Sequence, residues 1–441
     1  MKRFNAILLL IGLIAAAAAC GRRPAESGTA AAPVQNGPAE TALPQAAAYH
    51  DVFDPETDFD NRFGRTFVSV TETEKAIYYL PSHGGYIYYF DKESGESGVL
   101  CAKPECEHDS KPADRDCQGY IGAQLATLNH RGGKLYYMGS APLSESRIGA
   151  AVFCMAEDGS GREKLFPMDC EPIYGPQRLD LHRGKFYARS MSEKIEDGVP
   201  KQFRSVSSWD LETGEFKSIY EGAGASTVIP TLFFFGRYVY ICVSWKPGFD
   251  TETGGEGARN GSVTELYRWD TEEEKLETIA RTEQDFELGW MPSIWVDSEE
   301  RIYIVPKTAS IGNGQKAAVY MLRDGSLTES FDFGMDGSMD VLDGGVILYD
   351  FDREKETMAV HIRDFGGAAV FDGELDMRFL RGIAAGAEFK SFYAAAGDLN
   401  TVYFSMILKA DDGMGDKSVL LRCDLSGGEP VPAVLCVGNW E

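Results

Sequence analysis

Along most of this chain, apolar and polar positions alternate in short stretches that are separated by turns containing glycine or aspartate. Typical stretches are GGKLYYMGS at 132–140, RGKFYARS at 183–190 and GRYVYICVS at 236–244. A period of two residues, rich in Tyr, Val and Ile, predicts half-buried β-strands. The Asp-Gly, Thr-Gly and Gly-Gly pairs between such stretches predict tight antiparallel turns. The pattern therefore indicates an all-β fold.

One phrase of two hairpins recurs about every 50 residues, which is the spacing of β-propeller blades. Its first half occurs at 84–91, 132–140, 183–190, 236–244, 300–307, 344–352 and 400–407. Its second half occurs at 152–166, 205–220, 264–280, 319–333, 360–371 and 420–435, and overlaps the first half in the opening unit, at 86–101. A single blade cannot bury both of its faces, whereas a closed ring of blades can. We predict a β-propeller of seven four-stranded blades over residues 49–441, with six or eight blades as alternatives. A pair of β-sandwiches would not keep one phrase over this length, and a parallel β-helix is the other competing fold.

The long insertions fall on one side of the predicted ring. In a propeller, the four strands of each blade follow one another outward from a central channel. The connections between first and second strands and between third and fourth strands then lie on one face of the ring, and in this sequence those connections are short. The longer stretches are predicted between second and third strands or between blades, at 139–150, 192–202, 245–261, 308–315, 410–416 and 101–122. A long loop loses conformational entropy on ordering without enlarging the core, so several on one face favour recognition. The alternative is that they are tolerated surface insertions.

Four residues in these connections are candidate ligand-binding residues: Trp245, Phe249 and Arg259 in the longest loop, and Trp290 between two blades. Aromatic and arginine side chains are enriched at binding hot spots. The alternative for each is packing at the rim of the ring, which is the favoured interpretation for Trp290.

The N-terminus carries a signal for export. Lys2 and Arg3 precede an uncharged apolar run that is too short to span a bilayer comfortably and ends in Ala17-Ala18-Ala19-Cys20-Gly21. This run resembles the bacterial lipobox, although that motif usually has Leu where Ala17 stands here. The resemblance implies a lipoprotein signal peptide at 1–19 and lipidation of Cys20; an ordinary secretory peptide is the alternative.

Residues 20–48 are rich in Ala and Pro and contain no aromatic residue until Tyr49, which predicts a disordered, flexible tether. The chain is therefore expected on the cell membrane, lipid-anchored and facing outside the cytoplasm. Its formal net charge is −25. Because such an excess repels phosphate backbones, nucleic acid is excluded as a favoured partner, and an envelope protein, peptide or glycan is expected instead.

Cys101, Cys106 and Cys117, with His108, form the pattern C-x4-C-x-H-x8-C. Three thiolates and one imidazole would complete a structural zinc site. Thiols outside the cytoplasm are often oxidised, however, so a disulfide is the competing prediction. One of the three cysteines would then be unpaired or bonded to a distant partner, for which Cys154 and Cys170 are candidates. A disulfide, a metal site and unpaired thiols all remain open.

Two further features have alternatives. Asp54, Asp58, Asp60 and Asn61 offer oxygen ligands of the kind that calcium prefers, but a solvated acidic segment leading into the ring is the favoured prediction. Cys423 and Cys436 flank a hairpin, and a bridge between them is left open.

The repeat resembles bacterial propellers of the TolB-like and low-density-lipoprotein-receptor-like kind, over roughly residues 65–436. The stretch LCAKPECEHDSKPADRDC at 100–117 is similar to one found in exported lipoproteins with propeller domains. These resemblances imply architecture and export, but no reaction.

No G-x-S-x-G, H-E-x-x-H, P-loop or dinucleotide motif occurs. A binding or scaffold module acting through the long-loop face is therefore predicted. The alternative is an extracytoplasmic glycan-active lyase or hydrolase with its site in the central channel. Convergent carboxylate, His and Arg side chains in an open channel would favour the enzyme, and a plugged channel would favour the binding module.

Overall fold

The structure is a computed structural model that describes residues 53–439 apart from 65–68, 82–84, 109–115, 123–126, 145–146, 169–175, 197–198, 224–229, 246–260, 287, 289–291, 307–316, 385 and 411–414. The chain divides into the units Met1–Gln45 and Ala46–Glu441, and all described residues belong to the second. In this described part, no helix is both long and apolar enough to cross a membrane.

Seven antiparallel sheets of four consecutive strands each make up the described fold. We number them as blades 1 to 7 in chain order. Blade 1 contains β1 (Ser69–Glu72), β2 (Ala76–Leu80), β3 (Tyr88–Asp91) and β4 (Ser97–Val99), and blade 2 contains β5 (Leu128–Arg131), β6 (Lys134–Ser144), β7 (Arg147–Ala156) and β8 (Glu163–Pro167). Blade 3 contains β9 (Pro176–His182), β10 (Lys185–Glu196), β11 (Val199–Asp210) and β12 (Phe216–Ala223). Blade 4 contains β13 (Thr231–Phe235), β14 (Tyr238–Trp245), β15 (Ser262–Asp270) and β16 (Lys275–Gln284). Blade 5 contains β17 (Ser293–Val296), β18 (Ile302–Val305), β19 (Ala318–Arg323) and β20 (Ser326–Asp332). Blade 6 contains β21 (Ser338–Leu342), β22 (Gly345–Asp352), β23 (Thr357–Asp364) and β24 (Ala369–Asp376). Blade 7 contains β25 (Glu388–Gly397), β26 (Thr401–Lys409), β27 (Lys417–Asp424) and β28 (Val431–Asn439). Two short 3-10 helices, η3 (Asn61–Phe63) and η5 (Arg378–Gly382), accompany the strands.

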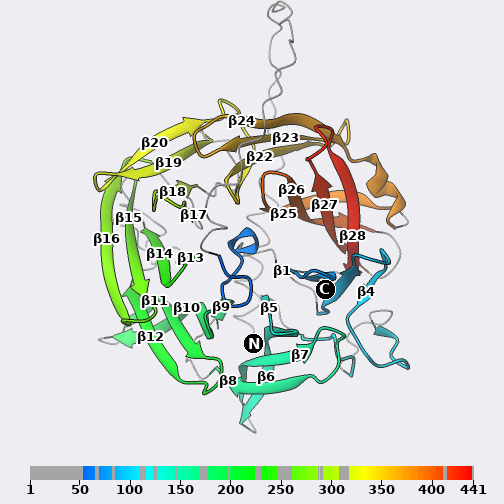
Figure 1. Cartoon of the computed structure of the whole chain (residues 1–441), viewed down its shortest axis with the longest axis horizontal. Coiled ribbons are helices and arrows are strands. Elements are labelled where there is room, and N and C mark those ends of the chain that lie inside the picture. Colours follow the sequence, from blue (N-terminus) through cyan, green and yellow to red (C-terminus); the bar gives the residue numbers. More distant parts are fainter. Residues whose placement is uncertain are drawn as a thin grey trace, which may run out of the picture. The chain divides into compact units, whose positions relative to one another are not determined.

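The seven sheets form a ring, with the first strand of each blade innermost (Figure 1). Apolar side chains fill the space between neighbouring blades. Phe233 of blade 4, for example, meets Trp295 of blade 5 edge to face, with ring centroids 4.9 Å apart. Both side chains are almost fully buried. Each sheet thus buries its faces on its neighbours, and the predicted seven-bladed propeller is confirmed.

Blade 1 differs from the predicted assignment. The stretch 84–91, taken as the first half of the repeat, contributes β3, the third strand. The first two strands lie earlier, and they pair from Ser69 opposite Leu80 to Glu72 opposite Ile77. The turn between them contains no glycine, so it lacks the signal that marks this turn in blades 2, 3, 4 and 6. Tyr88 therefore lies on a third strand, whereas Tyr136, Tyr187 and Tyr240 lie on the second strands of blades 2, 3 and 4.

Two of the predicted long loops are strands. Residues 139–150 and 192–202 lie in the hairpins β6–β7 and β10–β11, which continue beyond the inner strands of their blades. On β10, pairing with β9 stops at Ser190, whereas pairing with β11 continues to Glu196 opposite Val199. Cross-strand pairing satisfies the backbone here, so these insertions extend a sheet instead of forming irregular loops.

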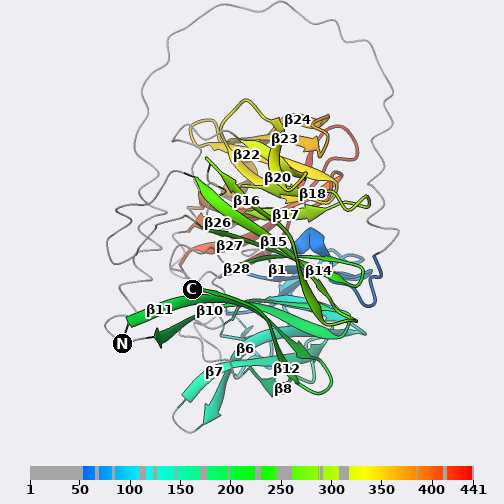
Figure 2. The same ribbon diagram turned by 90° about the vertical axis from the view of Figure 1, so that its left-hand side faces the viewer.

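The two faces of the ring differ in their connections. On the face of the first–second and third–fourth connections, every link between strands has two to six residues. On the opposite face the links reach 28 residues, between β4 and β5. We call the first the short-turn face and the second the long-connection face. Figure 2 shows the β10–β11 hairpin extending on the side opposite the blue ribbon, which contains η3.

Candidate metal centre

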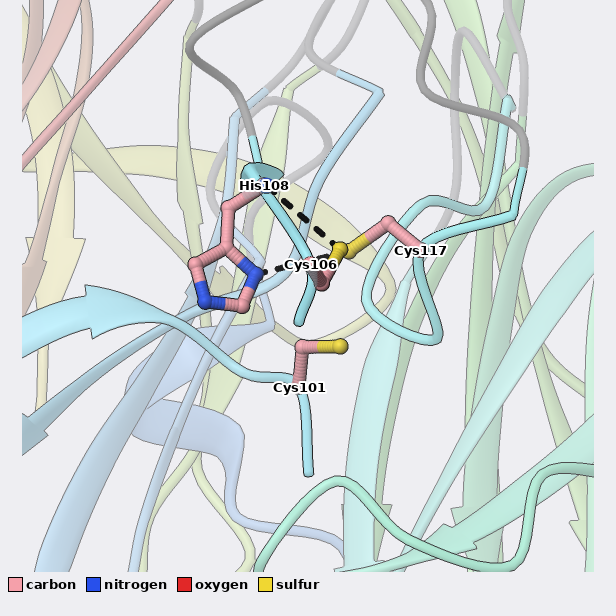
Figure 3. Close-up of side chains that lie close together, drawn as sticks. All are labelled: Cys101, Cys106, His108 and Cys117. Atoms are coloured by element: carbon pink, nitrogen blue, oxygen red, sulfur yellow. Dashed lines mark hydrogen bonds between the residues drawn. The ribbon is translucent and has the colours of Figure 1, made fainter. Parts of the chain in front are cut away.

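Cys101, Cys106, His108 and Cys117 come together in the connection between blades 1 and 2 (Figure 3). Their ligand atoms all lie within 4.8 Å of one another. Cys117 is buried, and the other three are partly buried. The sequence pattern thus predicted a cluster that the fold assembles.

The backbone around the cluster is held by pairing with blade 1. Leu100 donates its N–H to the carbonyl of Ile87, and Ile87 donates its own N–H to the carbonyl of Gly119. A β-carbon on Gly119 would lie 2.5 Å from the carbonyl oxygen of Leu100, so only glycine fits there. The segments at Leu100 and at Gly119, which begin and end the part of the connection that carries the cluster, are therefore held side by side by blade 1. Cys101 and Cys117, which lie near these positions, are brought close together as a result.

Each of the three sulfurs accepts a hydrogen bond from the backbone N–H two residues further along the chain. Lys103 donates to Cys101, His108 donates to Cys106 over 3.4 Å, and Gly119 donates to Cys117. The N–H of Gln118 also donates to Cys101. Hydrogen bonds of this kind favour the charged form of an acid, here the thiolate that a metal needs.

The thiols at this site differ in their tendency to ionise. Burial raises the pKa of Cys117 to about 12, against the opposing hydrogen bond from Gly119. Burial also disfavours ionisation of Cys101, but the two N–H donors and the neighbouring thiols outweigh it and lower that pKa. Without a cation, the cluster can therefore hold one thiolate more readily than three.

The donor set fits a tetrahedral metal ion. Zinc–sulfur bonds of about 2.3 Å and zinc–nitrogen bonds of about 2.0 Å place tetrahedral ligands about 3.5–3.8 Å apart. The observed limit of 4.8 Å needs a contraction of only about an ångström. His108 also has a positive φ of 55°, an uncommon backbone state for a non-glycine residue. The cluster can hold a metal.

No disulfide joins cysteines in the described part of the chain. Cys154, a candidate distant partner, is a free buried thiol on β7 and is not part of the cluster. Cys423 and Cys436 are free thiols that do not face each other, because Cys423 pairs with Pro432 and Cys436 with Leu420. Cys20 and Cys170 lie outside the described residues.

Sequence reasoning missed a second site, at the centre of the ring. Residues 53–64, which we call the plug segment, lie among the inner strands, and their helical turn η3 is the blue element in the middle of Figure 1. The expectation of a solvated acidic segment holds only at residues 54–56, which are exposed. It is wrong for the rest of the segment, where Phe59, Asn61 and Phe63 are all less than 9% exposed. In hindsight, the phenylalanines interspersed among its acidic residues were a signal that part of the segment is buried.

The plug segment is bonded to the ends of inner strands at the short-turn face. Phe59 donates its N–H to Nδ1 of His182 over 3.1 Å, at the end of β9. Asn61 bonds the backbone of Phe234 on β13 in both directions, at 2.6 and 3.0 Å. Phe63 meets Tyr403 of blade 7 edge to face, with ring centroids 5.5 Å apart. One segment thus contacts blades 3, 4 and 7 across the channel.

Buried polar groups of blade 3 hold the plug segment. Arg178 pairs with Asp180 over 2.7 Å and donates to the carbonyl of Phe63 over 2.8 Å. Burial lowers the pKa of His182 to about 4, although Asp58 opposes the shift. The imidazole is therefore neutral near pH 7, with Nδ1 accepting from Phe59 and Nε2 donating to the carbonyl of Gly236 over 2.8 Å.

The predicted binding residues lie mostly outside the described residues. Trp245 ends β14, is partly buried, and carries the Arg281 guanidinium 5.5 Å from its ring centroid. It packs against the apolar cluster between blades 3 and 4, which is the rim packing weighed as an alternative. Phe249, Arg259 and Trp290 cannot be placed among the described side chains.

No known family model matches this sequence, and no curated protein sequence matches it. Among solved structures, the chain is similar to an acylaminoacyl peptidase of Pyrococcus horikoshii at 15% identity and a TM-score of 0.36, over 71% of this chain and 52% of the peptidase. It is similar to the oligogalacturonate lyase of Vibrio parahaemolyticus at 12% identity and a TM-score of 0.40, over 69% and 74% of the two chains. It is also similar to the β-propeller domain of the Trilobed protease of Pyrococcus furiosus at 16% identity and a TM-score of 0.36, over 72% and 95%. The chain thus spans about half the length of the peptidase that it matches.

Proposed function

We propose that this protein is a lipid-anchored, extracytoplasmic binding module that engages its partner through the long-connection face. The observation that supports this most is the plug segment. It occupies the short-turn end of the channel, and the Arg, Asp and His side chains that converge there, Arg178, Asp180 and His182, bond to one another or to the plug segment and its neighbours. Groups committed in this way are not free to act on a substrate, so the binding module is favoured over the enzyme.

The surface that we propose for recognition lies opposite the plug segment. The extended hairpins β6–β7 and β10–β11 belong to adjacent blades and continue past their inner strands. The 16-residue connection 246–261 follows Trp245 in the next blade. Three neighbouring blades therefore supply these three long elements, which suits an extended ligand such as an envelope protein, a peptide or a glycan.

The anchor in this proposal is a lipid on Cys20, after removal of residues 1–19, with residues 20–48 as the tether. The net charge of −25 argues against direct adhesion to anionic headgroups, so attachment would depend on the lipid. In the same proposal, the Cys/His cluster holds a structural zinc ion.

Photo-crosslinking tests the proposed face. A crosslinking amino acid at Trp245 of the full chain, in its native envelope, should yield a defined adduct. The same amino acid at Glu212, an exposed turn residue between β11 and β12 on the short-turn face, is the control and should yield none. Equal adducts at both positions, or an adduct from Glu212 alone, would contradict the assignment.

Metabolic labelling tests the anchor separately. An alkyne fatty acid should label the wild-type chain, and Cys20→Ser should lose both the label and the membrane association. A labelled Cys20→Ser chain, or an unlabelled wild type, would overturn the anchor without bearing on the binding face.

A further inference from the structure

The contact between blade 7 and blade 1 is the one place where the described ring closes without a chain connection. Blade 7 consists only of β25–β28 and blade 1 only of β1–β4, so no strand is exchanged between the two ends. We call this contact the closing seam. It depends on side-chain packing and on a few hydrogen bonds, such as Tyr79 Oη to Ser418 Oγ at 2.7 Å and Asn439 N–H to Tyr88 Oη at 3.1 Å.

The Cys/His cluster lies against this seam. Cys117 belongs to the same buried apolar cluster as Tyr88 of blade 1 and Leu435 and Cys436 of blade 7. Cys101 and Cys106 pack on that cluster from outside. The fit is close, since a β-carbon on Gly438 of β28 would lie only 2.2 Å from the ring of Tyr88. The position of the connection that carries the cysteines therefore bears directly on how β28 packs.

We infer that a zinc ion held by Cys101, Cys106, His108 and Cys117 is the clasp of the ring: it fixes the connection between blades 1 and 2 against the closing seam. The inference rests on the proposed zinc ion and gives that ion a structural task. The geometry favours zinc over a disulfide in two respects. All four donors converge, including the imidazole that a disulfide would not use, and every sulfur accepts an N–H that stabilises a thiolate.

The chemistry balances without an oxidant or a reductant. Each of the three thiols loses its proton to solvent and forms a sulfur–zinc bond, while a ring nitrogen of His108 donates its lone pair. Zn²⁺ with three thiolates and one neutral imidazole leaves one net negative charge, and the four backbone N–H donors at the sulfurs partly offset it. Because the unfolded chain has no such preformed site, the binding free energy adds to the stability of the folded ring.

The first experiment measures occupancy in the full chain, purified in detergent without reductant. We expect one zinc per chain by elemental mass spectrometry, and intact mass with all three thiols unoxidised after denaturation in acid and chelator. A mass two daltons lower, with a disulfide-linked peptide among Cys101, Cys106 and Cys117 and no metal, would overturn the site.

The second experiment measures what the ion does. After removal of zinc by a chelator, hydrogen–deuterium exchange should quicken about tenfold or more in β28 and β3 at the closing seam. Exchange in β17, at the seam between blades 4 and 5, should not change, and adding zinc chloride should restore β28. Zinc bound at one per chain, with unchanged exchange in β28 on its removal, would refute the clasp while leaving the metal site intact.

Matched variants separate loss of the metal from loss of packing. His108→Asn removes the imidazole and keeps a residue type that tolerates a positive φ, so it should lose most of the zinc and reproduce the fast exchange in β28. Cys154→Ala removes a free buried thiol outside the cluster and should keep full zinc occupancy. Zinc retained in His108→Asn at the wild-type level would exclude His108 as a ligand. The crosslink at Trp245 is an independent measurement, so failure of the clasp and failure of the binding face remain distinguishable.

Discussion

The two faces of the ring are made from the same repeat, yet they differ in how tightly the chain is held. At the short-turn face, the links have two to six residues, and the buried plug segment is hydrogen-bonded to His182 and to the backbone of Phe234. At the long-connection face, links reach 28 residues in length, and the hairpins β6–β7 and β10–β11 extend beyond the inner strands of their blades. Because successive connections of an antiparallel sheet alternate between its ends, one face can carry most of the stability of the ring while most of the other is free to vary. The exception is the β4–β5 link, which carries the Cys/His cluster. The comparison predicts that changes at the first face destabilise the molecule, whereas changes in the other connections of the second face alter what it binds.

The largest effect is expected from truncating the plug aromatics. Phe63 is 3% exposed and lies against Tyr403, so Phe63→Ala should lower the free energy of unfolding by about 3–5 kcal/mol. Denaturant titration of the full chain measures this. Phe216→Ala is the control, because Phe216 is 52% exposed and should lose about 1 kcal/mol or less. Equal losses in the two variants would mean that the plug segment does not support the ring.

The next effect is a dependence on pH through His182. Its pKa in the folded protein is about 4, below the reference value of 6.5 that also approximates the unfolded chain. Between these values the unfolded state binds the extra proton, so stability is full above about pH 6.5 and falls as the pH drops towards 4. The loss should reach up to about 3 kcal/mol. Asp58, 3.7 Å from the ring nitrogen, reduces it by favouring the charged imidazole, whereas Arg183 disfavours that charge.

His182→Gln tests this assignment. A glutamine can accept from Phe59 and donate to Gly236, but it cannot gain the proton. The variant should therefore be less sensitive to acid between pH 6.5 and 4 than the wild type, as measured by thermal unfolding at each pH. An unchanged slope would assign the acid sensitivity to other groups.

Removing the Asn61 side chain should have an intermediate effect. Asn61→Ala leaves both the N–H and the carbonyl of buried Phe234 without their partner, so we expect a loss of about 1–3 kcal/mol. Asn400→Ala, at an exposed position in a turn of the same face, should be nearly neutral. A neutral Asn61→Ala would show that water replaces the amide and that the plug segment is looser than described.

The smallest effect is expected at the long-connection face. Six Gly/Ser residues inserted at 197–198, between β10 and β11, should change stability by about 1 kcal/mol or less. The same insertion between Arg183 and Gly184 should destabilise more, because it opens the two-residue turn between β9 and β10, in which Arg183 donates to the carbonyl of Thr57 and Gly184 accepts from Leu211. Melting temperatures of the two insertions, compared side by side, decide whether the faces differ as claimed. Similar shifts would contradict the difference.

The ring was predictable from sequence because blade formation depends on local alternation, which the second strands around Tyr136, Tyr187 and Tyr240 display clearly. The metal cluster was predictable for a similar reason, since its four residues lie within 17 positions of one another. The plug segment was not, because its contacts are with residues more than 100 positions away, such as His182 and Phe234. No local pattern records such a partner. The extended hairpins were missed because polar residues at their tips resemble loops until cross-strand pairing is known.

The most direct test of this account is amide exchange in the plug segment of the full chain at neutral pH. Phe59 N–H is bonded to His182, and Phe234 N–H to Asn61, across the centre of the ring. We expect peptides that cover residues 57–64 to be protected to a similar degree as β13, over hours. Complete exchange of those peptides within seconds, while β13 stays protected, would mean that the channel is open at this end, and it would return the enzyme to consideration.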